Sequence, residues 1–128
     1  MITEVTEDYV SFEIAKLLKE KGFKEITQGY INTDREVYML PFQQGVYELS
    51  DKQYPYPTLQ MAMKWLRDTY KLCIVIEPII TDDDGSAGCL WRFSISKLLE
   101  LQYKSEFIYE CYEVACEAAI KYCLTNLI

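Results

Sequence analysis

Histidine is absent from the 128 residues of this chain. Because no imidazole is present, a Ser–His or Cys–His nucleophilic pair is excluded, as is every zinc site that needs a histidine ligand. The sequence also lacks a glycine-rich phosphate loop, a G-x-S-x-G nucleophile elbow and a dinucleotide-binding fingerprint. We therefore predict no catalytic, cofactor-binding or metal-ligating residue, no cofactor, and a protein that is not an enzyme.

Close cysteine spacing is lacking as well. The sequence has 5 cysteines, and no two of them form a C-x-x-C pair or another close zinc spacing. An odd number of cysteines without a secretory signal is typical of reduced thiols in a reducing compartment. We expect all of them to behave as small apolar residues: Cys73, Cys89, Cys111, Cys116 and Cys123.

Basic residues are few. The chain has 13 lysines and arginines against 20 acidic residues, for a net charge of −7. Binding to phosphates needs clustered basic side chains, so no direct binding to nucleic acid is expected. No apolar run approaches the roughly 18 residues that span a bilayer, and the start "MITEVTEDYVSFE" has no signal-peptide pattern. The sequence predicts a cytoplasmic protein that does not enter a membrane.

The stretch "TDDDGSAG" at 81–88 raises the question of a metal loop. A calcium-binding EF-hand needs an acid at loop position 1 and a bidentate glutamate at position 12. Aligning Gly85 with position 6 puts Ile80 and Trp91 at those two places, and the flanks have strand patterns. Aspartate and glycine are also the residues that hairpin turns use. We interpret the stretch as a hairpin turn, with weak cation binding at Asp82–Asp84 as the alternative.

Composition predicts a globular protein, with 50% hydrophobic and 26% charged residues. A chain of this length most often forms one domain, so we expect a single domain over 1–128. Two helices have clear end signals. Ser11 is a natural N-cap for a helix that Gly22 ends in the left-handed conformation, and Thr58 caps a second helix after Pro57.

The C-terminal segment "YEVACEAAIKYCLTNLI" has the pattern of a third helix. Only Glu113, Glu117 and Lys121 form a plainly polar ridge on it. A helix this apolar must be covered on more than one side, either by the sheet or by a second copy of the protein.

Strand patterns occur in two places. "REVYMLPF" predicts a strand at about 36–40, with a turn at 32–34 and a short partner strand at 29–31. "LCIVIEPII" and "CLWRFSISK" predict a β-hairpin over 72–97, in which the first strand is central because it is almost continuously apolar. The segment 43–57 is expected to be an ordered loop. The predicted fold is α+β in two layers, with three helices and one small, mostly antiparallel sheet in the order α-β-α-β-β-α. The strand at 36–40 is expected to join this sheet beside the hairpin.

Three blocks of the sequence are distinctive together: "SFEIAKLLKEKGF", "PTLQMAMKWLR" and "YEVACEAAIKYCLTNLI". In this order they resemble a group of small uncharacterised proteins of gut Bacteroides genomes, prophages and related mobile elements. This chain differs from the group in its longer middle segment, "FQQGVYELSDKQYPYP". The resemblance implies a bacterial or phage origin and an accessory role, and it carries over no site residue.

The leading functional hypothesis is a non-enzymatic protein–protein interaction module that is associated with a phage or mobile element. Its partner would be another protein or a second copy of the chain in a homodimer. The predicted contact surface consists of Tyr54, Tyr56, Cys116, Ile120, Cys123, Leu124 and Leu127.

Two alternatives remain open. An acidic chain could inhibit a host nuclease or DNA-binding protein by mimicking nucleic acid. A small carboxylate-dependent enzyme is the other alternative, and Glu77 is its best residue because it is the one acid in an apolar strand. We expect Glu77 to reach water at a strand edge. Trp65, Trp91 and Phe93 could line an aromatic pocket, but their spacing favours positions in the core.

Overall fold

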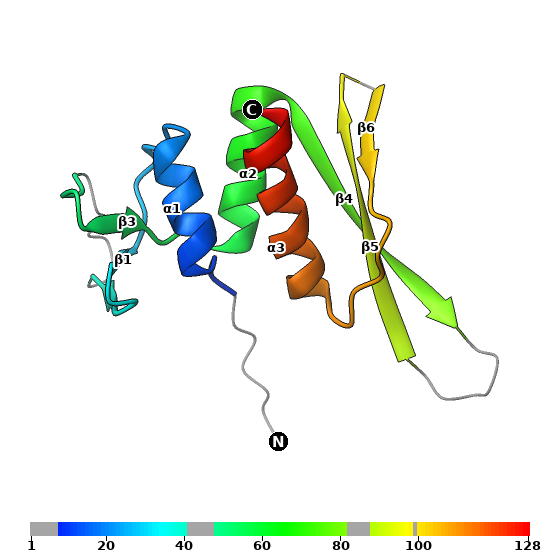
Figure 1. Cartoon of the computed structure of the whole chain (residues 1–128), viewed down its shortest axis with the longest axis horizontal. Helices are drawn as coiled ribbons and strands as arrows, with labels where there is room; N and C mark the ends of the chain where they lie inside the picture. Colours follow the sequence, from blue (N-terminus) through cyan, green and yellow to red (C-terminus); the bar gives the residue numbers. More distant parts are fainter. Residues whose placement is uncertain (1–7, 41–47, 82–87, 99) are drawn as a thin grey trace. The chain divides into compact units, whose positions relative to one another are not determined.

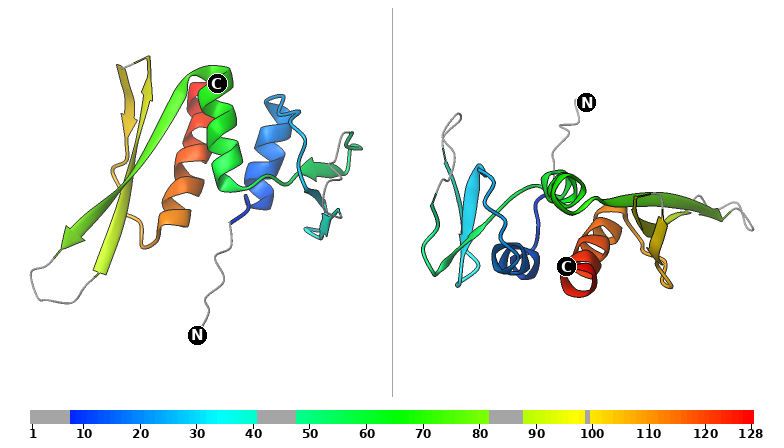
Figure 2. Two further views of the ribbon diagram at one scale, coloured as in Figure 1. Left: turned by 180° about the vertical axis from the view of Figure 1, so that it is seen from behind. Right: turned by 90° about the horizontal axis from the view of Figure 1, so that it is seen from above.

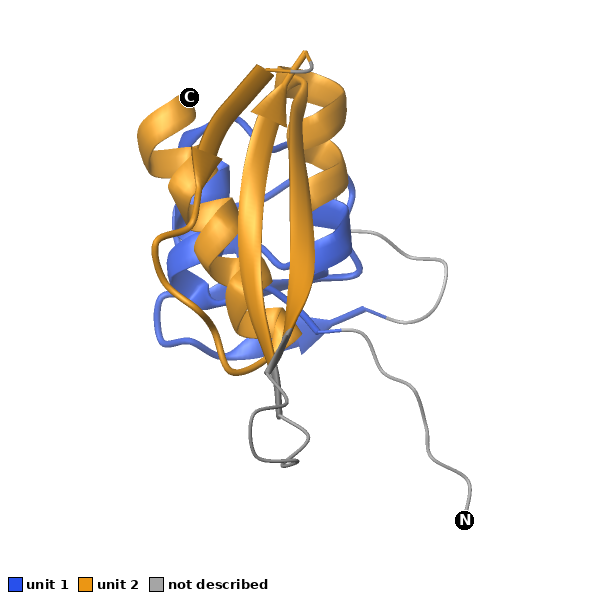
Figure 3. Ribbon diagram, turned by 90° about the vertical axis from the view of Figure 1, so that its right-hand side faces the viewer, with its two compact units in different colours: residues 1–62 blue, residues 63–128 orange. Residues whose placement is uncertain are grey.

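The computed structural model describes residues 8–40, 48–81, 88–98 and 100–128. The chain divides into two compact units, residues 1–62 and 63–128, which Figure 3 shows in blue and orange. Each unit contains one three-stranded antiparallel sheet. The α+β class, the three helices and the hairpin that the sequence predicts are confirmed. The strands form two sheets, however, where one was expected, because the strand at 37–39 does not join the hairpin. The expectation of a single domain stays a prediction.

Unit 1 begins with helix α1 (Phe12–Glu20), and both of its predicted end signals are present. The Ser11 hydroxyl accepts a hydrogen bond from the Ile14 amide at 3.3 Å, which satisfies an N–H group that has no partner within the helix. At the other end, Gly22 has a φ of 90°. The Phe23 amide donates to the Leu18 carbonyl at 2.9 Å, as in a Schellman motif. These local bonds fix both ends of α1.

The sheet of unit 1 has the order β2-β1-β3, formed by β1 (Gly29–Asn32), β2 (Val37–Met39) and β3 (Gln53–Pro55). The predicted turn between the first two strands is confirmed, because the Asn32 side chain accepts hydrogen bonds from the Asp34 and Glu36 amides. Strand β3 lies in the segment that we expected to be a loop. Its pairing with β1 overrides the low strand propensity of a stretch that contains proline.

Gly29 permits the close pairing of β1 with β2. A Cβ atom at this position would lie 2.5 Å from the Tyr38 carbonyl oxygen and 2.6 Å from the Met39 sulfur. We therefore expect Gly29→Ala to destabilise the chain by about 1–3 kcal/mol, because the two strands must move apart. Urea titration followed by circular dichroism measures the change. Glu25→Ala is the control, since this exposed side chain lies outside the sheet, and an equal loss in both variants would contradict the explanation.

Helix α2 (Leu59–Tyr70) spans the boundary between the two units. The Thr58 hydroxyl accepts a hydrogen bond from the Met61 amide at 3.1 Å, so the predicted cap is confirmed. The helix ends at Tyr70, and the next residue, Lys71, has a left-handed φ of 61°. Its side chains on the predicted apolar face are buried, with the exception of Met61 and the half-buried Tyr70: Leu59, Ala62, Met63, Trp65 and Leu66.

Unit 2 contains a sheet of order β4-β5-β6, formed by β4 (Leu72–Thr81), β5 (Gly88–Lys97) and β6 (Glu100–Lys104). The long β4–β5 hairpin confirms the predicted one, and its ten paired positions run from Leu72↔Lys97 to Thr81↔Gly88. The prediction that the first hairpin strand is central was wrong. β5 is central and β4 is an edge strand, because the sequence did not reveal β6 on the other side.

The hydrogen-bonding direction along β4 follows from β5. The Trp91 and Tyr109 backbones exchange two hydrogen bonds, at 2.8 and 2.7 Å, and the Ser105 amide donates to the Phe93 carbonyl at 2.9 Å. The backbone groups of Trp91 and Phe93 therefore point away from β4. In an antiparallel pair, two residues directly opposite each other point their N–H and C=O groups either both toward or both away from the partner strand. The backbone groups of Pro78 and Ile76, the β4 partners of Trp91 and Phe93, therefore point outward, away from β5.

Pro78 thus lies within the strand rather than near its end, and it costs no ladder bond because its nitrogen faces the outer edge. Of the two faces of the hairpin, one carries Ile74 and Ile76 opposite the buried Ile95 and Phe93. The other carries Cys73, Val75 and Glu77 opposite Ser96, Ser94 and Arg92.

Helix α3 (Tyr112–Tyr122) continues into one π-helical turn at Cys123–Leu127. The helix lies along the sheet of unit 2, as the views in Figures 1 and 2 show. Stacked rings join the two: Tyr122 lies on Tyr103 of β6, with ring centres 3.7 Å apart, and Tyr112 meets Trp91 edge-on at 5.3 Å. In the described part of the chain, no helix is long and apolar enough to cross a membrane.

Candidate functional site

The C-terminal part of the predicted contact surface lies inside the chain. Cys116, Ile120, Cys123 and Leu124 have no exposed area, and only Leu127 is partly exposed. The prediction that these four form an outer contact surface is therefore corrected. The physical reason is that the chain itself covers the apolar stripe, which was the other interpretation that the sequence allowed.

Tyr54 and Tyr56, the loop part of that surface, are half-buried, and Tyr54 holds β3 against α1. Tyr54 meets Phe12 of α1 edge-on at 5.3 Å, and the Lys19 ammonium lies 5.0 Å from the Tyr54 ring centre. Tyr56 stacks on Tyr9 at 4.7 Å, and burial raises the pKa of its hydroxyl. Their ring contacts make both residues structural, and their role in binding a partner stays a prediction.

A cavity of about 450 Å³ lies beside the end of α1 in unit 1. Lys19 closes one side, because its ammonium group donates to the Ser50 and Gln53 carbonyls at 2.6 and 2.7 Å. The cavity carries acids and bases together, so it does not favour one sign of ligand charge. Its lining residues are far apart in the sequence, and no motif marks them: Lys19, Gly22, Phe23, Lys24, Glu25, Thr27, Glu48, Leu49 and Pro55.

Glu77, the best residue of the enzyme hypothesis, forms an ion pair with Arg92 at 3.2 Å. The two residues are directly opposite each other on β4 and β5, and the Glu77 side chain is 43% exposed. The expectation that Glu77 reaches water at a strand edge is confirmed. Trp65 and Phe93 are buried, as their spacing favoured, and Trp91 is half-buried against Tyr112.

The two fully buried thiols on the C-terminal helix are poorly suited to act as nucleophiles. Burial raises the pKa of Cys116 to about 11 and that of Cys123 to about 12. Since the thiolate is the reactive form, both groups are overwhelmingly protonated at neutral pH. Cys73 and Cys111 are free and more accessible.

Metal binding was considered at the consecutive aspartates, Asp82–Asp84, which lie outside the described residues. Among the residues that the structure does describe, no three histidine, cysteine or acidic side chains gather where they could hold a metal ion.

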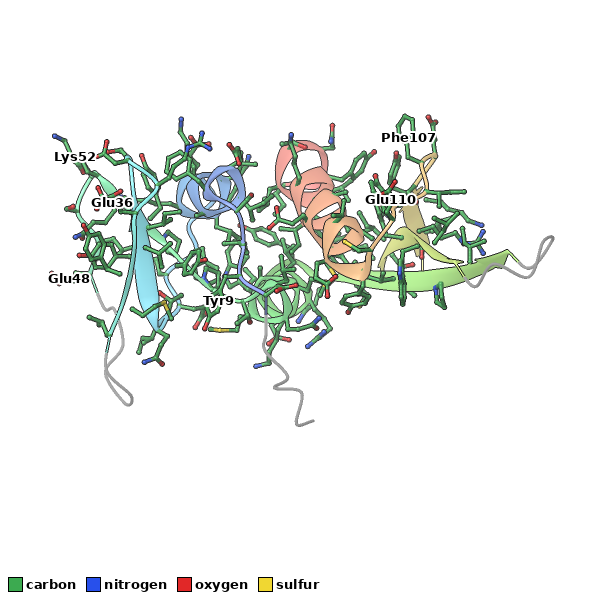
Figure 4. All side chains as sticks on the ribbon, turned by 90° about the horizontal axis from the view of Figure 1, so that it is seen from below. Tyr9, Glu36, Glu48, Lys52, Phe107 and Glu110 are labelled. Carbon is green, nitrogen blue, oxygen red and sulfur yellow. The ribbon has the colours of Figure 1, made fainter. Side chains whose placement is uncertain are left out.

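Sequence patterns did not mark one run of exposed apolar side chains, which we call the apolar edge. It consists of four large side chains along the β5–β6 turn, β6 and the segment that follows: Leu98, Leu101, Phe107 and Ile108. Their exposed fractions are 74%, 62%, 69% and 55%. Figure 4 shows Phe107 projecting from the segment between β6 and α3. The available signal was "LLELQYKSEFI", where apolar residues recur between charges without a helical or strand period.

No protein-family model matches the chain, and no curated protein or solved structure matches it either.

Proposed function

We propose that the chain is a protein-interaction module and that the apolar edge is its contact surface. The observation that carries the proposal is the exposure of four large apolar side chains between Leu98 and Ile108. Scattered exposed apolar residues are ordinary, whereas a group that follows one sheet edge is typical of a binding surface. The charged Lys104 and Glu106 between them would form the polar rim that interfaces have around an apolar centre.

The resemblance of the three helix blocks supports a setting in a phage or mobile element, with an accessory rather than a catalytic role. Under this proposal the partner is a protein with an exposed apolar groove. The cavity in unit 1 and the half-buried Tyr54 and Tyr56 take no part in the contact.

The test compares partner capture by the wild-type chain and by Phe107→Ser. Removing a large side chain from the centre of an interface costs about 1–3 kcal/mol, so we expect roughly a tenfold to hundredfold loss of affinity for the captured protein. Surface plasmon resonance with the purified partner measures the loss. Gln102→Ser on the same edge is the control, because Gln102 is exposed and polar. Equal binding by Phe107→Ser and the wild-type chain would refute the proposal.

A further inference from the structure

The cavity of unit 1 is apolar on the buried side of its lining. Its volume of about 450 Å³ lies within the range of about 300–1,000 Å³ that small-molecule sites occupy. Phe23 is 4% exposed, and Pro55 is fully buried. The buried Thr27 hydroxyl donates to the Gly29 carbonyl at 2.7 Å, so its proton is already used within the chain. The buried part of the lining therefore suits the apolar body of a ligand rather than a charged group.

The exposed part of the lining carries charges of both signs. Lys24, Glu25 and Glu48 are exposed and form the part of the lining that meets water. Together with the half-buried Lys19, they place two bases and two acids around one cavity. A ligand with a single charge would be attracted by one pair of these groups and repelled by the other. A ligand with one positive and one negative group can match both pairs.

The Lys19 ammonium is fixed in place by a turn of the chain. It donates to the Ser50 and Gln53 carbonyls at 2.6 and 2.7 Å. These two residues also bond to each other, from the Gln53 amide to the Ser50 carbonyl at 3.1 Å and from the Ser50 amide to the Gln53 side-chain oxygen at 3.0 Å. Because the turn already orders the ammonium, little conformational freedom is left to lose when a ligand binds.

The charge of Lys19 is not cancelled by these partners. Both are neutral carbonyl oxygens, and none of the ion pairs among the described residues includes Lys19. The Tyr54 ring centre, 5.0 Å from the ammonium, stabilises the positive charge without neutralising it. An ammonium has three N–H donors, so one remains for an oxygen of a ligand. A carboxylate suits this donor best, because it adds charge attraction to the hydrogen bond.

From this arrangement we infer that the cavity binds a free α-amino acid with a large apolar side chain. The ligand carboxylate accepts a hydrogen bond from Lys19, and the ligand ammonium lies beside Glu25 and Glu48. The apolar side chain packs against Phe23 and Pro55, which removes it from water. The cavity belongs to unit 1 and the apolar edge to unit 2, so this inference goes beyond the proposed function and the two can fail separately.

Titration of the isotope-labelled full chain with L-phenylalanine, followed by NMR, is the first test. We expect saturable shifts of the Phe23, Thr27 and Leu49 amide signals with a Kd of about 1 mM or lower, as for a well-buried ligand of this size. L-Leucine should bind similarly, and L-alanine at least about tenfold more weakly, because it lacks the apolar body. Absence of saturable shifts with both L-phenylalanine and L-leucine, or shifts at other positions only, would overturn the inference.

Two analogues test whether both ligand charges are recognised, because each keeps the benzene ring and lacks one charge. Hydrocinnamate has no ammonium, and phenethylamine has no carboxylate. A hydrogen bond to a charged group contributes about tenfold or more to affinity, so each analogue should bind at least about tenfold more weakly than L-phenylalanine. An analogue that binds as tightly as L-phenylalanine would show that the missing charge is not recognised, contrary to the inference.

Lys19→Met keeps the apolar stem of the side chain and removes the ammonium. In this variant L-phenylalanine should bind no more tightly than phenethylamine, because the ligand carboxylate has lost its partner. If Lys19 served only to hold the turn at Ser50, both ligands would weaken equally and the preference would remain, which would contradict its role in binding. Lys52→Met is the matched control and should keep the preference, since Lys52 is exposed and lies outside the lining.

The double variant Glu25→Gln/Glu48→Gln tests the exposed part of the lining, because both carboxylates become neutral amides of the same size. Neither side chain is buried, so the variant should keep the stability of the wild-type chain. L-Phenylalanine should then lose its preference over hydrocinnamate and keep its preference over phenethylamine. An unchanged preference over hydrocinnamate would contradict the placement of the ligand ammonium. None of these results bears on binding through Phe107.

Discussion

Replacing Ile95 with alanine is expected to destabilise the chain by about 2–5 kcal/mol, the range that large-to-small core substitutions cover. Ile95 lies in the central strand β5 and has no exposed area. It faces Ile74 on one side and Tyr103 on the other. Tyr103 in turn stacks on Tyr122 of α3, so the space left by the deleted carbons is walled by rigid neighbours and collapses poorly. Chemical unfolding in urea measures the loss.

Val75→Ala is the matched control for this prediction. Val75 lies one residue from Ile74 on the same hairpin, but it is on the opposite face of the sheet and 46% exposed. Its truncation should cost less than about 1 kcal/mol, because little buried area is lost. Similar losses for the two variants would show that the α3-facing side of the sheet is not the core of unit 2.

Alkaline pH is expected to unfold the chain through its two buried thiols. The pKa of a cysteine thiol rises from 9.0 to about 11 at Cys116 and to about 12 at Cys123, in both cases first of all because burial disfavours the thiolate. Between pH 9 and 11 the folded thiols keep their protons while the unfolded ones lose theirs. Stability is therefore complete below pH 9 and falls as the pH rises through the folded values, on the order of 3 kcal/mol for each thiol.

The double variant Cys116→Ala/Cys123→Ala separates this effect from other titrations. Tyr56 and Tyr109 also have a raised pKa, mainly from burial, and contribute in the same direction. The variant should start from lower stability at pH 8, because it loses buried sulfur atoms, yet its stability should decline less steeply to pH 11. Urea midpoints at both pH values give the two slopes. If stability falls equally steeply with pH in the wild-type chain and the double variant, groups other than the two thiols cause the alkaline loss of stability.

The helices were predictable from sequence because their signals are local. Ser11, Gly22 and Thr58 act within a few residues of their own positions, so the chain around each one is enough to identify it. The hairpin was predictable for the same reason, since its alternating strand and its apolar strand are close in sequence. Pairing between elements was harder. The pairing of Val37–Met39 with the strand at Gly29–Asn32 was predicted and is confirmed. That these strands form a sheet separate from the hairpin was not predicted, because nothing in their own residues encodes it.

The strands that the sequence did not reveal lack the usual composition. β3 includes Pro55, and proline normally argues against a strand; as an edge strand, β3 can accept it. Three of the five residues of β6 are charged or polar amides, since an edge strand exposed to water needs no continuous apolar face. Because β6 was not predicted, β4 was wrongly expected to be the central strand. A central strand can be identified only when the strands on both sides of it are known.

The contact surface was predicted from chemistry that the fold uses for packing. The C-terminal stripe around Ile120 is apolar enough for an interface, yet the same property fits a core helix, and burial within the chain decided between them. Val114, an apolar residue on the same helix, is 49% exposed. The exposed Phe107 carries no periodic signal, so only coordinates could reveal the apolar edge.

The outward nitrogen of Pro78 restricts how the length of β4 can change among related chains. Inserting or deleting a single residue between Leu72 and Pro78 would reverse the direction of the backbone groups and side chains that follow. The Pro78 nitrogen would then face β5, and the Glu77 side chain would lie on the sheet face that α3 covers. Inserting or deleting two residues would preserve both the outward direction of the Pro78 nitrogen and the sheet face of Glu77. Homologous sequences should therefore differ in this stretch only by even steps, and odd-numbered length variation should be confined to positions beyond the proline.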